Sequence, residues 1–79
     1  MKTTFFAVKD ELAGTFYAPS LFNTEAEAKR NFATAINQNP IWHDNASDFS
    51  LFKLGSYDDS TGLITTKLEK VVSGHSVKK

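Results

Sequence analysis

One amphipathic helix with well-marked ends divides this chain into two parts and limits the folds that it can adopt. Thr24 and Glu27 form a Thr-x-x-Glu capping box, in which each side chain accepts a hydrogen bond from the other residue's backbone N–H. The spacing i, i+4, i+7, i+8 then makes one buried stripe, formed by Ala28, Phe32, Ala35 and Ile36. The helix ends before Pro40, because a residue that precedes proline is pushed out of the α region.

Short apolar segments on both sides of this helix have the composition of β-strands. Residues 3–8 and 15–18 predict an antiparallel hairpin, whose second strand ends at Pro19. Residues 49–54 and 63–68 predict two strands joined by the turn sequence 58–62, and residues 69–72 are an optional fifth strand. The order is β-β-α-β-β. We therefore predict an α+β fold, a small antiparallel sheet of four or five strands with one helix packed on one face.

The chain has 79 residues and no cysteine, which excludes disulfides and thiolate zinc sites. We expect one domain over residues 1–73 and a flexible basic tail over residues 74–79. A domain of this size buries only roughly 60% of its unfolded surface, so we expect a homodimer to supply extra stability. No apolar run approaches the ~20 residues that span a bilayer, and the first residues lack the apolar core of a secretory signal. We therefore expect a cytoplasmic protein with no membrane partner.

The net charge of zero conceals an uneven distribution along the chain. Residues 41–66 contain one lysine and four aspartates, a net charge of −3, whereas residues 67–79 contain four lysines and one glutamate, a net charge of +3. A total of zero is unfavourable for nucleic-acid binding, which gains much of its affinity from phosphate neutralisation. The basic C-terminal segment keeps that function open.

Residues that could support catalysis or metal binding do not form a known constellation. His43 and His75 have no partner at helical or hairpin spacing. The acidic segment 58–61 lacks the ligand spacing of a calcium loop and is more typical of a hairpin turn. The sequence has no Gly-rich phosphate loop and no nucleophile motif. We therefore expect no enzyme activity, no cofactor and no metal site.

Five aromatic residues lie in or beside the predicted strands, namely Phe5, Phe16, Tyr17, Phe49 and Tyr57. A sheet face that combines exposed aromatics with lysines can stack the bases of a single strand and contact its phosphates. The candidates chosen for such a sheet face are Phe5, Tyr57, Lys9 and Lys53. Separate candidates for phosphate contacts are Lys29 and Arg30 on the helix, and Lys67 and Lys70 near the C-terminus. The alternative is that a second copy of the chain covers the aromatic face, while the charged residues form a solvated helix face and a solubilising tail.

Trp42 follows Pro40 in a stretch, residues 41–47, that we predict to be a loop. Exposed tryptophans often anchor protein interfaces, so Trp42 is a candidate protein-interaction residue. The alternative is that Trp42 folds back and caps the core between helix and sheet, because tryptophan is on average highly buried.

Four short blocks carry a family resemblance. They are residues 6–10 (Phe-Ala-Val-Lys-Asp), residues 17–22 (Tyr-Ala-Pro-Ser-Leu-Phe), the Ala-x-Arg-x-Phe spacing of residues 28–32, and the segment from Asp48 to Gly62. In order and spacing they resemble the small non-structural protein of gokushoviruses, the open-reading-frame-five family of these single-stranded-DNA phages of the Microviridae. The resemblance implies a non-structural protein in the cytoplasm of the infected bacterium, which binds DNA or assists genome replication. It supplies no binding residues.

Two functions agree with these observations. The first is an accessory protein that binds single-stranded DNA during genome replication or packaging, with lysines on the phosphates and sheet aromatics on the bases. The second is a protein-interaction adaptor for a phage replication, packaging or capsid protein, with no direct DNA contact. In the second case Trp42 and the edge strand near Pro19 would form the contact surface.

Overall fold

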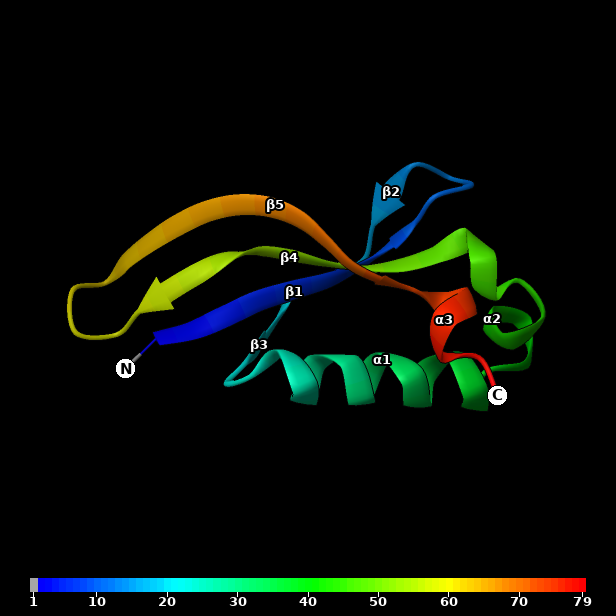
Figure 1. Cartoon of the computed structure of the whole chain (residues 1–79). Coiled ribbons are helices and arrows are strands. Elements are labelled where there is room, and N and C mark those ends of the chain that lie inside the picture. Colours follow the sequence, from blue (N-terminus) through cyan, green and yellow to red (C-terminus); the bar gives the residue numbers. More distant parts are fainter. Residues whose placement is uncertain (1) are drawn as a thin grey trace.

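The computed structural model describes residues 2–79 as an antiparallel sheet packed on one long helix (Figure 1). The strands, in chain order, are β1 (Lys2–Asp10), β2 (Thr15–Phe16), β3 (Ser20–Phe22), β4 (Phe49–Asp58) and β5 (Leu63–Ser73). The helices are α1 (Glu25–Gln38), α2 (Pro40–Asp44) and α3 (Gly74–Val77), with a 3-10 turn at Ala46–Asp48. The predicted α+β class, the antiparallel sheet and the packing of the main helix on it are confirmed.

β1 and β4 form the centre of the sheet, in the strand order β2-β1-β4-β5. On its other side, β1 pairs with β3 through its first half and with β2 through its second half. β2 and β3 are therefore one interrupted edge strand, broken around Pro19, which cannot donate a ladder hydrogen bond. The sequence predicted the break but missed β3, which returns to the same edge and brings Phe22 against the core.

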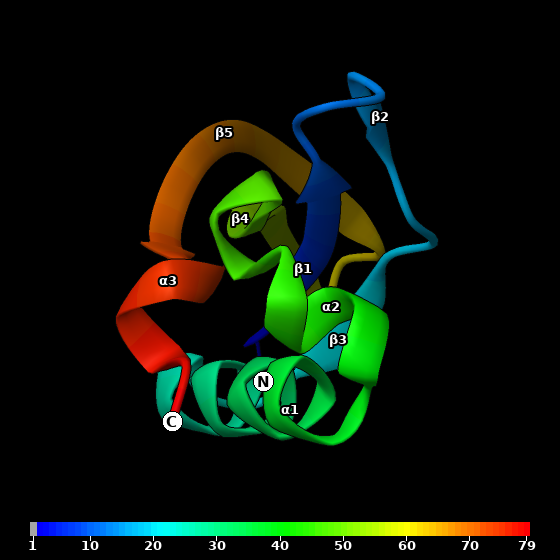
Figure 2. The same cartoon turned by 90° about the vertical axis from the view of Figure 1, so that its right-hand side faces the viewer.

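β5 is one continuous strand over residues 63–73, so the separate fifth strand considered for residues 69–72 is not formed. Its pairing with β4 shifts register twice, between Leu51 and Phe52 and between Lys53 and Gly55. Such shifts bend a strand and increase its twist. Figure 2, a view turned by 90°, shows β5 curving over β4.

α1 begins at its predicted cap. Thr24 Oγ1 accepts a hydrogen bond from the Glu27 backbone N–H at 3.2 Å. The second bond of the predicted capping box, from the Thr24 backbone N–H to the Glu27 side chain, is wrong. Glu27 Oε1 instead accepts a hydrogen bond from the Thr24 hydroxyl at 3.3 Å. At the other end, the backbone N–H of Asn39 donates to the Ala35 carbonyl at 3.2 Å.

The loop predicted for residues 41–47 is wrong, since Pro40–Asp44 form α2 and Ala46–Asp48 form the 3-10 turn. Asn39 Oδ1 accepts hydrogen bonds from the backbone N–H groups of Ile41 (3.1 Å) and Trp42 (3.3 Å). Pro40 occupies the first helical position, where its missing N–H leaves no bond unmade. The Asn-Pro pair therefore ends α1 and also starts α2.

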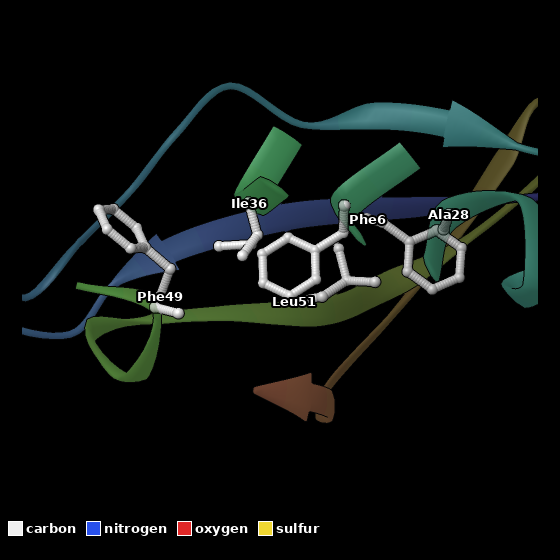
Figure 3. Packing of buried hydrophobic residues seen from close by; sticks show 7 residues of the cluster. Phe6, Ala28, Ile36, Phe49 and Leu51 are labelled. Atoms are coloured by element: carbon white, nitrogen blue, oxygen red, sulfur yellow. The ribbon is translucent and has the colours of Figure 1, made fainter. Parts of the chain in front are cut away.

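The core lies between α1 and the strands β1 and β4 (Figure 3). Ile36 of the predicted stripe is fully buried, and Phe6 of β1 is 2% exposed. The complete cluster contains Phe6, Ala28, Phe32, Ile36, Ala46, Phe49 and Leu51. Each large apolar side chain buried in this way stabilises the fold by about 1.5–3 kcal/mol.

Beyond the N-terminal end of α1, the hairpin of β4 and β5 continues with the start of β1 as a projecting arm (Figure 1). The longest extent of the molecule is 42 Å. At the tip, Asp58 Oδ1 accepts hydrogen bonds from the Ser60 hydroxyl (2.6 Å) and the Ser60 backbone N–H (3.0 Å), and these bonds lower the pKa of the Asp58 carboxyl. The predicted hairpin turn is confirmed, with Gly62 at φ 76°.

Residues 74–77 form the helical turn α3 in the segment for which the sequence predicted a flexible tail. The Asn37 side chain donates to the Val77 carbonyl at 3.0 Å and accepts from the Lys79 backbone N–H at 2.7 Å. Gly74 lies so close to the Ala46 carbonyl that a Cβ atom would collide with it. The segment therefore packs beside α1 because it has a glycine at the point of closest approach and an amide side chain that satisfies its backbone.

Candidate nucleic-acid interface

The alternation of side chains along β1 separates the two faces of the sheet. Phe6 and Val8 pack in or against the core cluster below the sheet, so Phe5, Ala7 and Lys9 point to the opposite side. Residues directly opposite one another on paired strands share a face. We call this second surface the open face; it comprises Thr3, Phe5, Ala7, Lys9, Phe16, Leu21, Ser50, Phe52, Tyr57, Ile64 and Lys70. α1 lies on the other side of the sheet (Figure 1).

Two phenylalanines and a lysine form the centre of the open face. The Phe16 and Phe52 rings lie 5.4 Å apart between centroids, edge to face at 78°. Lys9 Nζ lies 5.5 Å from the Phe16 centroid and 5.8 Å from the Phe52 centroid. Phe16 is 42% exposed. The cluster thus offers a flat aromatic surface beside a cation, which suits a ligand that has both a π-face and a negative charge.

A second basic residue of the open face lies beside an acid. Lys70 Nζ is 3.5 Å from Glu11 Oε2, and the same carboxylate oxygen accepts a hydrogen bond from the buried Ser50 hydroxyl at 3.0 Å. Glu11 is thereby held in place and offsets part of the positive charge. A phosphate that approached Lys70 would compete with Glu11, so this part of the face can contribute only modest phosphate affinity.

The open face continues onto the arm without charged side chains. Phe5 lies opposite Leu21 and Gly55, and Tyr57 lies opposite Thr3 and Ile64. Phe5 and Tyr57 are both half-buried. Both predicted aromatics therefore share a face with Lys9, but they lie farther along the sheet from it than Phe16 and Phe52 do.

Two of the predicted basic residues in the strands lie outside the open face. Lys53 is opposite Phe6, on the side of the sheet that faces α1. Lys67 lies beside the second register shift of β5, where its ammonium group is 3.5 Å from the Glu69 carboxylate. Neither residue extends the cluster formed by Lys9 and Phe16.

Lys29 and Arg30 are exposed on α1, below the sheet. Lys29 Nζ lies 3.5 Å from Glu25 Oε2, one helical turn away. A nucleic-acid strand laid along the open face would not reach either residue, because the sheet lies between them. The structure therefore does not unite the eight predicted nucleic-acid-binding residues in one surface.

Trp42 lies half-buried between two other aromatic rings. It stacks on Phe49 with centroids 4.5 Å apart and planes at 17°, and its centroid is 5.3 Å from that of Tyr17. This geometry matches the alternative in which Trp42 folds back onto the core. Beside it, a cavity of about 140 Å³ separates the interrupted edge strand from α1; its apolar lining includes Val8, Tyr17, Phe22, Phe32 and Trp42.

Phe52 and Glu11 are not indicated by the sequence as members of this surface. Phe16 is one of the five strand aromatics noted above, but the sequence does not place it beside Lys9. Phe52 alternates with Leu51 and Lys53, a pattern that separates two faces without showing which one the helix covers. Phe16 is opposite Lys9 only because of the register between β1 and β2. The residues that connect the two strands, 11–14, do not reveal that register.

Residues 2–79 form neither a metal-ligand cluster nor a membrane-spanning helix. In this range no group of three or more His, Cys, Asp or Glu side chains is placed to hold a metal ion. His43 Nε2 lies 2.7 Å from the Lys79 carbonyl oxygen, at hydrogen-bond distance. None of the helices described is long and apolar enough to cross a membrane.

Comparison with known proteins gave one match. A family model described as "Phage ORF5 protein" matches residues 3–77, which include almost all of the sheet, α1 and the whole open face. No curated protein and no solved structure matches the chain significantly.

Proposed function

Because the chain belongs to the phage ORF5 protein family, we propose that it is a non-structural phage protein that binds single-stranded DNA through the open face of its sheet. The family match confirms the resemblance to the open-reading-frame-five proteins of small phages. In this proposal the protein acts during genome replication or packaging in the cytoplasm of the infected bacterium. It acts by binding, without catalysis and without a cofactor.

The cluster of Phe16, Phe52 and Lys9 is the observation that carries this proposal. Stacking of one base on an aromatic side chain is worth about 1–3 kcal/mol, and it tolerates any sequence because every base has a π-face. Lys9 lies within 5.8 Å of both ring centroids, where its ammonium group could also contact the phosphate of a stacked nucleotide. Phe5 and Tyr57 would extend the stacking surface along the arm.

The same surface favours single strands over duplexes. In a duplex the bases are already stacked, so aromatic side chains on a sheet cannot reach their faces. The net charge of zero provides little attraction for duplex phosphates by themselves. Binding would therefore depend on unpaired bases.

Fluorescence anisotropy with labelled single-stranded and double-stranded oligonucleotides, at low and moderate salt, tests this function. We expect binding that prefers single strands and weakens with salt. Lys9→Ala should reduce the affinity more than Lys29→Ala, which removes the same charge on the other side of the sheet. Absence of binding at low salt, or equal effects of the two substitutions, would contradict the proposal.

A second candidate function is a protein-interaction adaptor, favoured by the apolar cavity between the interrupted edge strand and α1. Tyr17, 46% exposed, lines this cavity, and an extended peptide could place one apolar side chain in it. A pull-down from infected cells tests this candidate. Loss of a captured phage protein in Tyr17→Ala, with single-strand binding absent in the wild type, would replace the DNA-binding proposal.

A further inference from the structure

β5 exposes large apolar side chains, and its position at the edge of the sheet accounts for them. Leu63, Ile64 and Leu68 are 68%, 58% and 63% exposed, and every residue from 63 to 70 is exposed. Leu63 and Ile64 are adjacent in the strand, so their side chains point to opposite faces of the sheet. A layer packed on either face would cover only one of them. All three residues belong to β5, an edge strand of 11 residues. β5 pairs with β4 along one side, and its other side is open.

We propose that a second copy of the chain pairs with β5 in antiparallel orientation, about a two-fold axis at Leu68. In this register Leu68 meets Leu68 of the second copy, and Ile64 lies opposite Val72. Lys67 lies opposite Glu69 of the second copy, and Glu69 opposite Lys67, so both charge pairs are favourable. Cross-strand pairs of apolar residues and of opposite charges both stabilise a sheet.

The segment Lys67-Leu68-Glu69 makes the edge complementary to itself. Within one chain, Lys67 Nζ already lies 3.5 Å from Glu69 Oε2. Pairing about Leu68 would bring two such ion pairs together with the four charges alternating in sign. A register with Lys67 opposite Lys67 would instead place like charges together, which is destabilising. The charges therefore select the register centred on Leu68.

β5 also contains features that discourage pairing with unrelated strands. Lysines at positions 67 and 70 and the two register shifts against β4 are means by which proteins protect an exposed edge. They restrict the edge to a partner with matching curvature and a complementary charge pattern, and a second copy has both. This is why we assign the edge to self-association and not to an arbitrary extended peptide.

The dimer would place two copies of the open face on one side of a doubled sheet. A two-fold axis perpendicular to the sheet keeps both α1 helices on the same side and both open faces on the other. One DNA strand could then contact the open faces of both copies and bind more tightly than to one copy. This gain in affinity rests on the proposed function. The dimer itself does not depend on DNA.

Sedimentation equilibrium of the full chain without DNA, over a series of concentrations, tests the interface. We expect the wild type to reach twice the mass of the chain. Lys67→Glu and Glu69→Lys should each weaken association on the order of tenfold, because each converts two attractive cross-strand pairs into repulsive ones. The double variant Lys67→Glu with Glu69→Lys should restore it, since the pairs re-form with reversed signs.

Leu68→Asp should also dissociate the dimer, whereas Leu12→Asp, at a position that is 83% exposed and lies outside β5, should not. Circular dichroism checks that each variant is folded. A monomer at every concentration, or a dimer that tolerates Leu68→Asp, would overturn the proposal, as would failure of the double variant to recover. A dimer with these properties that binds no DNA would leave the interface standing and refute the proposed function alone.

Discussion

Truncation of Phe16 is the sharpest test of the open face. Phe16 is 42% exposed, lies in a strand of two residues and touches Phe52 at 5.4 Å between centroids. Removing its ring leaves the core cluster of α1, β1 and β4 unchanged, because Phe16 does not belong to it. The expected cost in stability is therefore confined to the aromatic pair, about 0.5–1.5 kcal/mol, and to the apolar area that the partly covered ring buries outside the core.

The expected cost in binding is larger. If one base stacks on this ring, Phe16→Ala removes about 1–3 kcal/mol, which corresponds to about a 5- to 150-fold loss in affinity for single strands. The dependence of affinity on salt should not change, because no phosphate contact is lost. Lys9→Ala should do the converse, lowering the magnitude of the slope of log K against log salt by about 0.7 for one single-strand phosphate contact.

Anisotropy titrations of both variants at four or more salt concentrations would separate these effects. Phe16→Leu retains most of the apolar area without the ring, so it should behave like Phe16→Ala if stacking is responsible. Leu12→Ala, in the connection between β1 and β2, should bind like the wild type. A Phe16→Ala protein that is folded and binds within about twofold of the wild type would refute the stacking surface.

Three further predictions concern the scaffold. Gly55→Ala should destabilise the domain by more than roughly 2 kcal/mol, because φ is 151° and the new Cβ would collide with the Thr65 carbonyl. Gly62→Ala has open space around the new Cβ and should cost only about 1–2 kcal/mol. Chemical denaturation measures both losses of stability, and equal losses would contradict this reasoning. Thr24→Ala should cost about 1 kcal/mol, since the N-cap bond to Glu27 is lost; an unchanged midpoint would show that the cap contributes nothing. Ser60→Ala should raise the pKa of Asp58 toward its usual value, measured by NMR titration, because the Ser60 hydroxyl is the main cause of the lowered pKa. The hydrogen-bonded Asp58 carboxylate stabilises the fold at pH values above the pKa that Asp58 has in the unfolded chain. This stabilisation is lost as the pH falls through the lower pKa of the folded state. The free energy of unfolding of Ser60→Ala should therefore fall less than that of the wild type between these two pKa values.

Local signals account for the parts of this fold that were predicted correctly. The cap at Thr24, the stripe ending at Ile36 and the stop before Pro40 all act within a few residues, so α1 could be placed from the sequence. The turn from Asp58 to Gly62 follows from side chains that bond to their own backbone. The sequence also carries a signal for α2, because Asn39 and Pro40 are typical of a helix start as well as of the end of α1.

Long-range pairing decided the candidate site. Lys9 and Phe5 share a face through simple alternation within β1, and the sequence could place them together. Phe16 and Phe52 join them only through the registers of β2 and β4 against β1. A slip of one residue would turn either ring to the other side of the sheet.

The sequence by itself therefore determined the α+β class, the main helix, the hairpin turn and the lack of thiol chemistry. Only the tertiary structure decided which aromatics surround Lys9, which side of the sheet α1 covers and which strand is left at an open edge. The physical reason is that helices and turns are stabilised by neighbours in the chain. The faces and edges of a sheet are instead set by hydrogen bonds between residues far apart, such as Ala7 and Phe52.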